Sequence, residues 1–245
     1  MRLHLESLDL GRKIFFEKLG GFRKFGYLAG GTALALQIGH RISYDFDIFC
    51  FKEISDTLLR KTRQAFSVQK ILVNSKEEFT FVIKNEIKIS FIYYPFKLDK
   101  FILKREKGLN LLSSKGIAVA KAYTLGRRGS WRDYVDLFFI LKTKKVQLKE
   151  IIIQAEKIYG EFFSEKLFLT QLVYTEDIDK KEILETKFLG KKTTLKQVKN
   201  CFKKEIDKYI FIKREAEADK DIARGRVIGP FKSIKGLLRT LKKKK

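Results

Sequence analysis

The sequence predicts an α+β protein: a mixed sheet with flanking helices, followed by a helical C-terminal domain. Alternating apolar residues, which are typical of strands, are concentrated before residue 112, whereas apolar residues at helical spacing dominate the chain after it. We therefore expect an α/β domain over residues 1–112, a helical domain over residues 113–210 and a basic C-terminal extension over residues 211–245.

The α/β half begins with a helix, a strand and a second helix. Apolar residues recur at helical spacing over Leu8–Leu19, and two glycines follow. The short apolar stretch Phe25–Ala29 predicts a strand that runs into Gly30-Gly31-Thr32. A helix is expected over Ala33–Ile38, and Gly39 occupies the position where a left-handed residue commonly ends a helix.

Four more elements complete this half. Alternation over Ile42–Phe51 predicts a strand, and Asp56–Phe66 has the pattern of a helix. Two β-rich runs, Phe79–Lys84 and Ile87–Tyr94, are separated by Asn85-Glu86, a connection typical of a hairpin.

The second half has the pattern of successive helices. Ser113 or Ser114 is suited to cap a helix that runs to Leu125. Three further helices are expected, over Arg132–Leu141, Gln147–Tyr159 and Leu195–Ile210. The last 14 residues carry seven positive charges and no negative one, which predicts a basic helix or tail.

The charge balance points to a phosphate-rich partner. The chain has 53 Lys and Arg against 29 Asp and Glu, a net charge of +24, and such an excess favours contact with nucleic acid. Lysine-rich composition also arises from AT-biased codon usage, which explains many lysines but not so few acidic residues. No apolar run reaches the roughly 18 residues that a membrane helix needs. With Cys50 and Cys201 far apart and no zinc spacing, we expect a cytoplasmic protein without a membrane partner.

Gly30-Gly31-Thr32 is followed 13 residues later by Asp45-Phe46-Asp47. Glycines between a strand and a helix let the backbone approach a bound group, and the helix N-terminus offers N–H groups to a phosphate. Two aspartates two residues apart on a strand point to the same face, where their carboxylates can hold Mg²⁺. Each element alone is more typical of a tight turn or a solvated strand edge than of a binding site, but their order and spacing together predict a triphosphate site.

These motifs resemble those of the AbiEii/AbiGii toxin-type nucleotidyltransferase family, within the DNA polymerase β-type superfamily. Two specific matches and a looser third one cover roughly residues 8–210. They are Tyr27–Leu36 with His40–Phe49, then Ile117–Tyr123 with Arg132–Leu137, and last Leu172–Asp177 with Lys196–Phe202.

The resemblance implies a fold, a reaction and a set of residue roles. Gly30, Gly31 and Thr32 would bind a nucleoside triphosphate, while Asp45 and Asp47 would ligate Mg²⁺ or Mn²⁺. Lys121 would reach the phosphates, and Asp133 or Asp136 would complete the catalytic site in a cleft between the two halves. The acceptor would be nucleic acid, RNA or a tRNA end, and the protein would be the toxin of a toxin–antitoxin or phage-defence pair with a cognate antitoxin.

The residues themselves leave simpler interpretations open. Lys121 could be an exposed helix lysine, Asp133 a partner of Arg128 or Arg132, and Asp136 a brace in the packing between the halves. Arg41, in the loop before the aspartates, is a candidate for phosphate or acceptor contact. Its neighbour His40 could either face the substrate or lie in a surface loop without a functional role.

Ser90 departs from the superfamily pattern. Many members carry a third carboxylate on a later strand, at the position that Ser90 occupies here. A serine cannot replace a carboxylate as a charged metal ligand or a base. Either Asp133 or Asp136 substitutes for it, or the chain is a catalytically weakened nucleic-acid-binding protein that keeps the fold. A third alternative is a protein or small-molecule acceptor, against which the charge argues.

Overall fold

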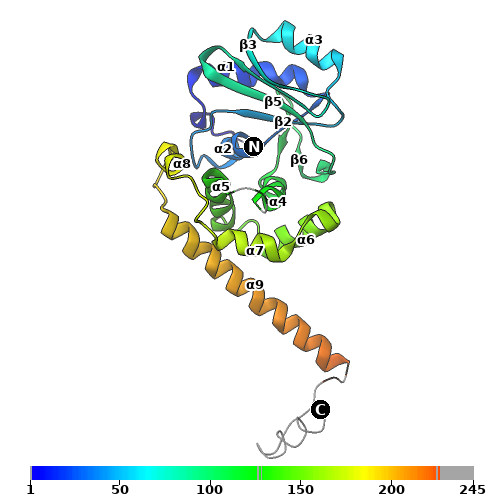
Figure 1. Cartoon of the computed structure of the whole chain (residues 1–245), viewed down its shortest axis with the longest axis vertical. Coiled ribbons are helices and arrows are strands. Elements are labelled where there is room, and N and C mark those ends of the chain that lie inside the picture. The colour runs from blue at the N-terminus through cyan, green and yellow to red at the C-terminus, as the bar shows by residue number, and fades with distance from the viewer. Residues whose placement is uncertain (1, 126, 128, 225, 227–245) are drawn as a thin grey trace, which may run out of the picture. The chain divides into compact units, whose positions relative to one another are not determined.

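A seven-stranded mixed sheet organises the first 112 residues, with the strands in the order β3-β4-β5-β2-β1-β7-β6 (Figure 1). The computed structural model describes residues 2–125, 127, 129–224 and 226. The strands are β1 (Gly26–Ala29), β2 (Phe46–Cys50), β3 (Val68–Asn74), β4 (Glu78–Ile83), β5 (Ile87–Tyr93), β6 (Ile102–Leu103) and β7 (Leu111–Leu112). β2 pairs with β5 in parallel and with β1 in antiparallel orientation, so β2 lies in the centre of the sheet.

Helices precede, interrupt and follow these strands. They are α1 (Leu10–Lys18), α2 (Gly30–Ile38), α3 (Asp56–Ala65), α4 (Ser114–Leu125), α5 (Trp131–Lys142), α6 (Leu148–Tyr159), α7 (Glu165–Val173), α8 (Lys180–Glu185) and α9 (Leu195–Ala223). Within the described part of the chain, every strand precedes residue 113, as the sequence predicts. The α+β fold class is therefore confirmed.

Local sequence explains where several helices begin. The Asp9 carboxylate accepts a hydrogen bond from the backbone N–H of Arg12, and Ser55 and Ser164 cap α3 and α7 in the same way. Ser113 accepts from the N–H of Gly116, so the expected serine cap of α4 is present. Each of these side chains satisfies a backbone donor that the first helical turn leaves without a partner.

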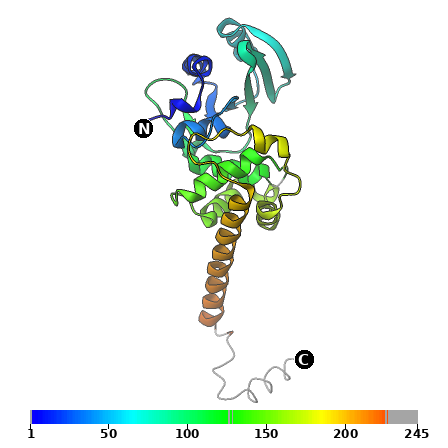
Figure 2. The ribbon, with the colours of Figure 1, turned by 90° about the vertical axis from the view of Figure 1, so that its left-hand side faces the viewer.

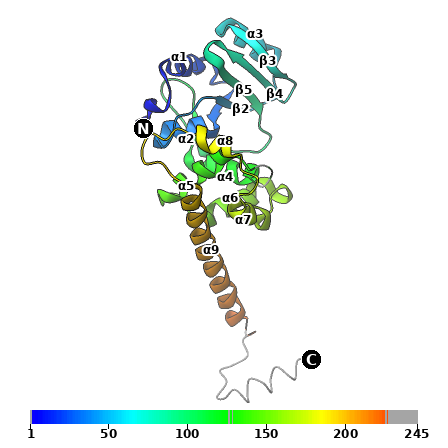
Figure 3. The ribbon, with the colours of Figure 1, turned by 60° about the vertical axis from the view of Figure 1, so that its left-hand side comes forward.

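Helix α4 forms the centre of the helical layer. It packs against α2 on the sheet side and against α5, α6 and α7 (Figures 1 and 3). Its residues from Gly116 to Ala122 are all buried, and four of these seven are glycine or alanine. Such small side chains let neighbouring helices approach on every side, which explains why this helix lacks a polar face.

The sheet differs from the sequence-based expectation at β2 and β3. The strand expected over Ile42–Phe51 is only Phe46–Cys50, because Arg41 forms a β-bridge with Phe188 and the N–H of Ile42 bonds to the carbonyl of Lys187. β3 was not expected, since its side chains are mostly exposed on both faces and no apolar face develops. Figure 2 shows the teal hairpin of β3 and β4 at the top of the view, above the green helices of the second half.

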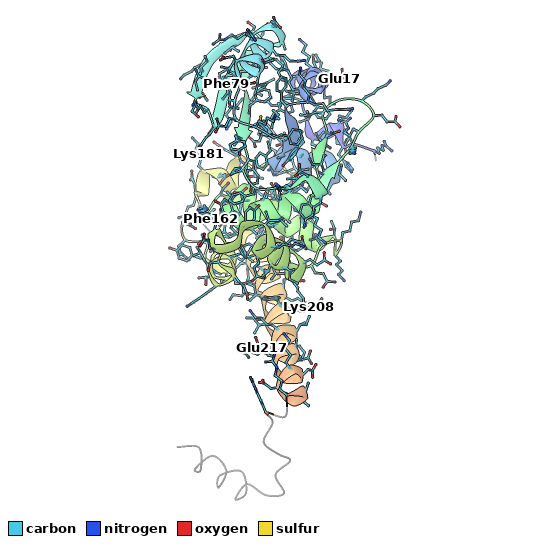
Figure 4. The ribbon with its side chains drawn as sticks, turned by 90° about the vertical axis from the view of Figure 1, so that its right-hand side faces the viewer. Glu17, Phe79, Phe162, Lys181, Lys208 and Glu217 are labelled. Carbon is cyan, nitrogen blue, oxygen red and sulfur yellow. The ribbon has the colours of Figure 1, made fainter. Side chains whose placement is uncertain are left out.

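The chain divides into two compact units, Met1–Lys203 and Lys204–Lys245. The boundary expected at residue 112 lies inside the first unit and stays a prediction. α9 ends at Ala223, beyond the expected Ile210, and its residues Lys208 and Glu217 are exposed (Figure 4). The basic run 232–245 lies outside the described residues. None of the described helices is both long and apolar enough to cross a bilayer.

Gly26 permits the close pairing of β1 with β2. A Cβ atom at this position would collide with the backbone carbonyl of Phe49, and backbone cannot move aside as a side chain can. We predict that Gly26→Ala lowers the free energy of unfolding by about 1–3 kcal/mol, as overpacking typically does. Urea denaturation measures this. Gly190→Ala is the matched control, because a Cβ there meets no atom within 4 Å; equal losses in the two variants would contradict the explanation.

Candidate functional site

The Gly-Gly-Thr turn, the two aspartates and the helical half meet in one pocket of about 280 Å³. Five of the residues predicted from the first half line it: Gly31, Thr32, Arg41, Asp45 and Asp47. Lys121 and Asp133 line it from α4 and α5, which lie beside α2 (Figure 3). Gly30 and Asp136 are not part of the lining, but each contacts a residue that is.

The two glycines are needed for different reasons. Gly30 has a left-handed backbone (φ +63°), and a Cβ on it would lie 2.7 Å from Oδ2 of Asp47. Gly31 has no such backbone, but a Cβ there would collide with the guanidinium of Arg41. The first turn of α2 therefore lies directly against Asp47 and Arg41, which only glycine permits.

Thr32 connects the start of α2 to the segment that carries the aspartates. Its hydroxyl lies 2.7 Å from Oγ of Ser43 and also donates to the backbone carbonyl of Asp45. The side chain is buried, so its hydroxyl holds Asp45 in place through the backbone.

Asp45 and Asp47 stand at the start of β2. Asp45 immediately precedes the strand and Asp47 is its second residue, and both are part-buried. Oδ2 of Asp45 lies 3.3 Å from Nζ of Lys88. In the parallel pairing of β2 with β5, Asp47 is the register partner of Ser90, which is itself buried. Ser90 thus occupies a place where a third carboxylate would lie beside Asp47.

A buried cluster of charged groups lies behind this pocket, centred on Asp136. Its side chain is fully buried. The guanidinium of Arg41 donates twice, from Nε to Oδ1 (2.8 Å) and from Nη2 to Oδ2 (3.0 Å). His40 Nε2 lies 2.7 Å from Oδ1, and Lys121 Nζ lies 2.8 Å from Oδ2. Asp136 therefore joins the loop before β2 to helices α4 and α5.

Lys121 is shared between two carboxylates. Nζ donates to Oδ1 of Asp133 at 2.5 Å as well as contacting Asp136, and both aspartates lie on one face of α5, three residues apart. Lys121 is thus buried and paired, not an exposed helix lysine. Arg128, another partner considered for Asp133, lies outside the described residues.

The pKa shifts follow from this mutual neutralisation. Burial alone would raise the pKa of Asp136, but Arg41, Lys121 and His40 hold it well below its usual range. Burial opposes the charge on Lys121, and Asp133 and Asp136 outweigh it and raise the pKa. For His40 burial prevails over the hydrogen bond to Asp136, so its pKa is lowered and the ring is neutral near pH 7.

Six residues of the pocket lining were not predicted as site residues: Ser43, Tyr44, Lys88, Ser130, Arg132 and Glu182. Glu182, on α8, accepts hydrogen bonds from the Ser130 hydroxyl and the Trp131 N–H, both at 2.7 Å, and so closes the pocket at the N-terminus of α5. Ser43 and Lys88 had a signal in the sequence, since strand alternation places Ser43 on the same face as Asp45 and Lys88 on the same face as Ser90.

Comparison with known proteins identifies the chain's relatives. No protein-family model matches it. Over 188 residues it is 33% identical to the Aquifex aeolicus (strain VF5) protein described as uncharacterized protein aq_aa25, a match that covers 75% of this chain and 87% of the other. The chain belongs to the same family as aq_aa25.

Solved structures extend the comparison to the fold. MenT4, the nucleotidyltransferase toxin Rv2826c from Mycobacterium tuberculosis H37Rv, superposes with a TM-score of 0.54 and 16% identity, covering 81% of this chain and 82% of MenT4. A Helicobacter pylori protein described as a candidate nucleotidyltransferase gives 0.51 and 17%, covering 82% and 95%. The chain has the nucleotidyltransferase fold, as the resemblance implied.

Asp136 is expected to be essential for stability. Asp136→Asn would leave Arg41 and Lys121 buried without their shared negative charge, and breaking a buried pair in this way typically costs about 3–5 kcal/mol. Chemical denaturation measures the loss. Glu150→Gln removes an ion pair with Lys115 whose side chains are 38% and 42% exposed, and it should cost less than about 1 kcal/mol. Similar losses of unfolding free energy in both variants would show that the buried cluster contributes no more to stability than the Glu150–Lys115 pair does.

A second expectation concerns pH. Because the folded-state pKa of His40 lies below the usual 6.5, the neutral ring stabilises the fold above about pH 6.5. That contribution is lost as the pH falls through the lower folded-state pKa. His40→Gln should therefore flatten the decline of unfolding free energy between about pH 7 and 5, whereas Glu150→Gln should not. An unchanged slope in His40→Gln would rule out this source of the pH dependence.

Proposed function

We propose that the chain is a metal-dependent nucleotidyltransferase that transfers a nucleotidyl group from a nucleoside triphosphate to a hydroxyl of RNA. The observation that carries the proposal is the shared pocket, in which a glycine turn at a helix N-terminus, a pair of aspartates and a lysine from the opposite half come together. This is a combination of groups suited to phosphoryl chemistry, which depends on positioning and electrostatics.

The triphosphate is placed at the start of α2. There the backbone N–H groups and the positive end of the helix dipole favour phosphate oxygens, and the absence of a side chain on Gly31 lets the cationic guanidinium of Arg41 lie against the same turn. Lys121 lines the same pocket with a raised pKa, so its ammonium keeps its charge near the phosphates.

The donor set fits Mg²⁺ or Mn²⁺. Asp45 and Asp47 both line the pocket and are part-exposed, and such ions prefer carboxylate oxygens completed by water and substrate phosphates. Among the described residues, no three His, Cys, Asp or Glu side chains gather as a metal site. A bound ion would therefore rely on the two aspartates and the triphosphate, and it would neutralise charge on the reacting phosphoryl group.

The reaction is an in-line displacement at the α-phosphorus. The acceptor oxygen forms a bond to this atom as the bond to the bridging oxygen breaks, pyrophosphate leaves with the electron pair, and the hydroxyl proton passes to water. In this scheme Asp133 fixes Lys121 toward the phosphates, and Asp136 fixes both Lys121 and Arg41 without contacting substrate.

Our proposals for the acceptor and the biological role are based on the net charge of the chain and on the resemblance of its motifs. A net charge of +24 favours a polyanion, and RNA, including a tRNA end, fits an acceptor with a free hydroxyl. The motifs resemble the AbiEii/AbiGii family, and MenT4 is a toxin. We therefore place the chain in the cytoplasm as the toxin of a toxin–antitoxin or phage-defence pair, with a cognate antitoxin as its partner.

A specific observation supports a second candidate function. Ser90 stands beside Asp47 where a third carboxylate is expected, and it is buried among β-strands. A site weakened in this way would leave a protein that binds nucleic acid without transferring nucleotides.

A transfer assay separates the two functions. The purified chain is incubated with Mg²⁺, each labelled triphosphate in turn and total RNA, and incorporation is measured. We expect label from at least one triphosphate, and a fall of about 100-fold or more in Asp45→Asn and Asp47→Asn, the size typical for losing one group that stabilises a transition state. Both side chains are part-exposed, so these variants should fold.

Glu150→Gln is the control and should transfer at the rate of the unchanged chain, because its part-exposed pair with Lys115 lies outside the pocket lining. Tight RNA binding without incorporation of any triphosphate would contradict the enzyme and favour the second candidate. In that case RNA binding should be unaffected by Asp45→Asn, as expected of a protein that binds RNA without using the aspartates.

A further inference from the structure

Lys88 places a positive charge beside the aspartate pair. It lies one residue before Ile89, the register partner of Phe46, so it stands next to Asp45 on the sheet face that also carries Ser90. Its Nζ lies 3.3 Å from Oδ2 of Asp45, and the two side chains are 40% and 30% exposed. The ammonium is therefore accessible from the pocket that it lines.

Lys88 differs in its partner from the other basic residues of the pocket. Lys121 and Arg41 are paired with Asp136, and Arg132 lies 3.3 Å from Glu182. Those carboxylates all belong to the helical half. Lys88 instead contacts one of the two carboxylates proposed to hold the metal ion.

A two-metal site needs more carboxylate than this pocket offers. A first ion between Asp45 and Asp47 would use both side chains. Asp133 is engaged with Lys121, and Glu182 accepts hydrogen bonds from Ser130 and Trp131. Since Ser90 supplies no charge beside Asp47, the described lining residues leave a second ion without a carboxylate of its own.

We infer that the pocket is built for one divalent cation, and that the Lys88 ammonium supplies the positive charge that a two-metal site would take from its second ion. The inference rests on the proposed function and deepens it. An ammonium is a compact charge with three donors, so Lys88 can keep its contact with Asp45 while a second N–H donates to an oxygen of the α-phosphoryl group. In a two-metal site the second ion helps to neutralise charge at the same place.

The number of bound ions tests this directly and without turnover. Mn²⁺ is titrated into the chain together with a non-hydrolysable triphosphate analogue, and bound Mn²⁺ is counted by electron paramagnetic resonance. We expect one ion per chain. In the double variant Lys88→Gln, Ser90→Asp we expect two, because a carboxylate is added beside Asp47 and the competing cation is removed.

Two bound ions in the unchanged chain would overturn the inference while leaving the proposed enzyme intact. No bound Mn²⁺ with the analogue, together with no transfer, would overturn both. A double variant that still folds and still binds a single ion would show that Lys88 and Ser90 do not set the number of ions.

Transfer kinetics provide the second test. Lys88→Gln should lower kcat by about 100-fold with a smaller change in KM, since the charge is needed most in the transition state. Lys88→Arg should recover part of the loss because it keeps the charge. Lys70→Gln, an exposed lysine on β3 of the same sheet, is the control and should leave kcat unchanged. A kcat of Lys88→Gln equal to that of the control would overturn the inference.

Discussion

The carboxylate of Asp136 is the group on which the arrangement of the site depends. It is fully buried and is approached by the guanidinium of Arg41 and the imidazole of His40, both from the loop before β2, and by the ammonium of Lys121 from α4. A buried charge is tolerated only when its partners satisfy it, so these segments must come together in one geometry. The position of Arg41 in turn explains why the first turn of α2 has glycine at position 31.

The buried Asp136 cluster also distinguishes residues that can contact a ligand from residues that only position other side chains. The sequence motifs do not make this distinction. Asp45 and Asp47 are part-exposed and line the pocket, whereas Asp136 lies behind it with both oxygens in contact with cations. The first two can meet a ligand, and the third can act on a ligand only through Lys121 and Arg41. Arg41 and Thr32, which the sequence suggested as nucleotide contacts, are themselves tied to protein groups, although both line the pocket.

Much of the fold and part of the site could be predicted because they leave local signals. The glycine turn, the spaced aspartates and the Asn85-Glu86 connection each have a conformational reason that is visible in the residues; both Asn85 and Glu86 indeed have positive φ. Glu182 could not be found in this way, because its role arises from α8 packing against α5, some fifty residues away in the chain. β3 was missed because it is an edge strand without a buried face. Lys88 was missed because only the parallel register of β2 with β5 brings it next to Asp45.

The pairing of the loop before β2 with the segment around Phe188 has a consequence for how the protein is made. The N–H of Ile42 bonds to the carbonyl of Lys187, and the N–H of Leu189 bonds to that of His40. Together with Glu182, these contacts come from residues 182–189 and line or support a pocket whose glycines and aspartates lie within residues 30–47. During translation the first 112 residues can leave the ribosome with their strands complete, yet the pocket lacks a wall until roughly 75 more have followed. A polypeptide cut short by a nonsense codon anywhere in that interval would lack a complete pocket, so the nascent chain has none until this later segment has been made.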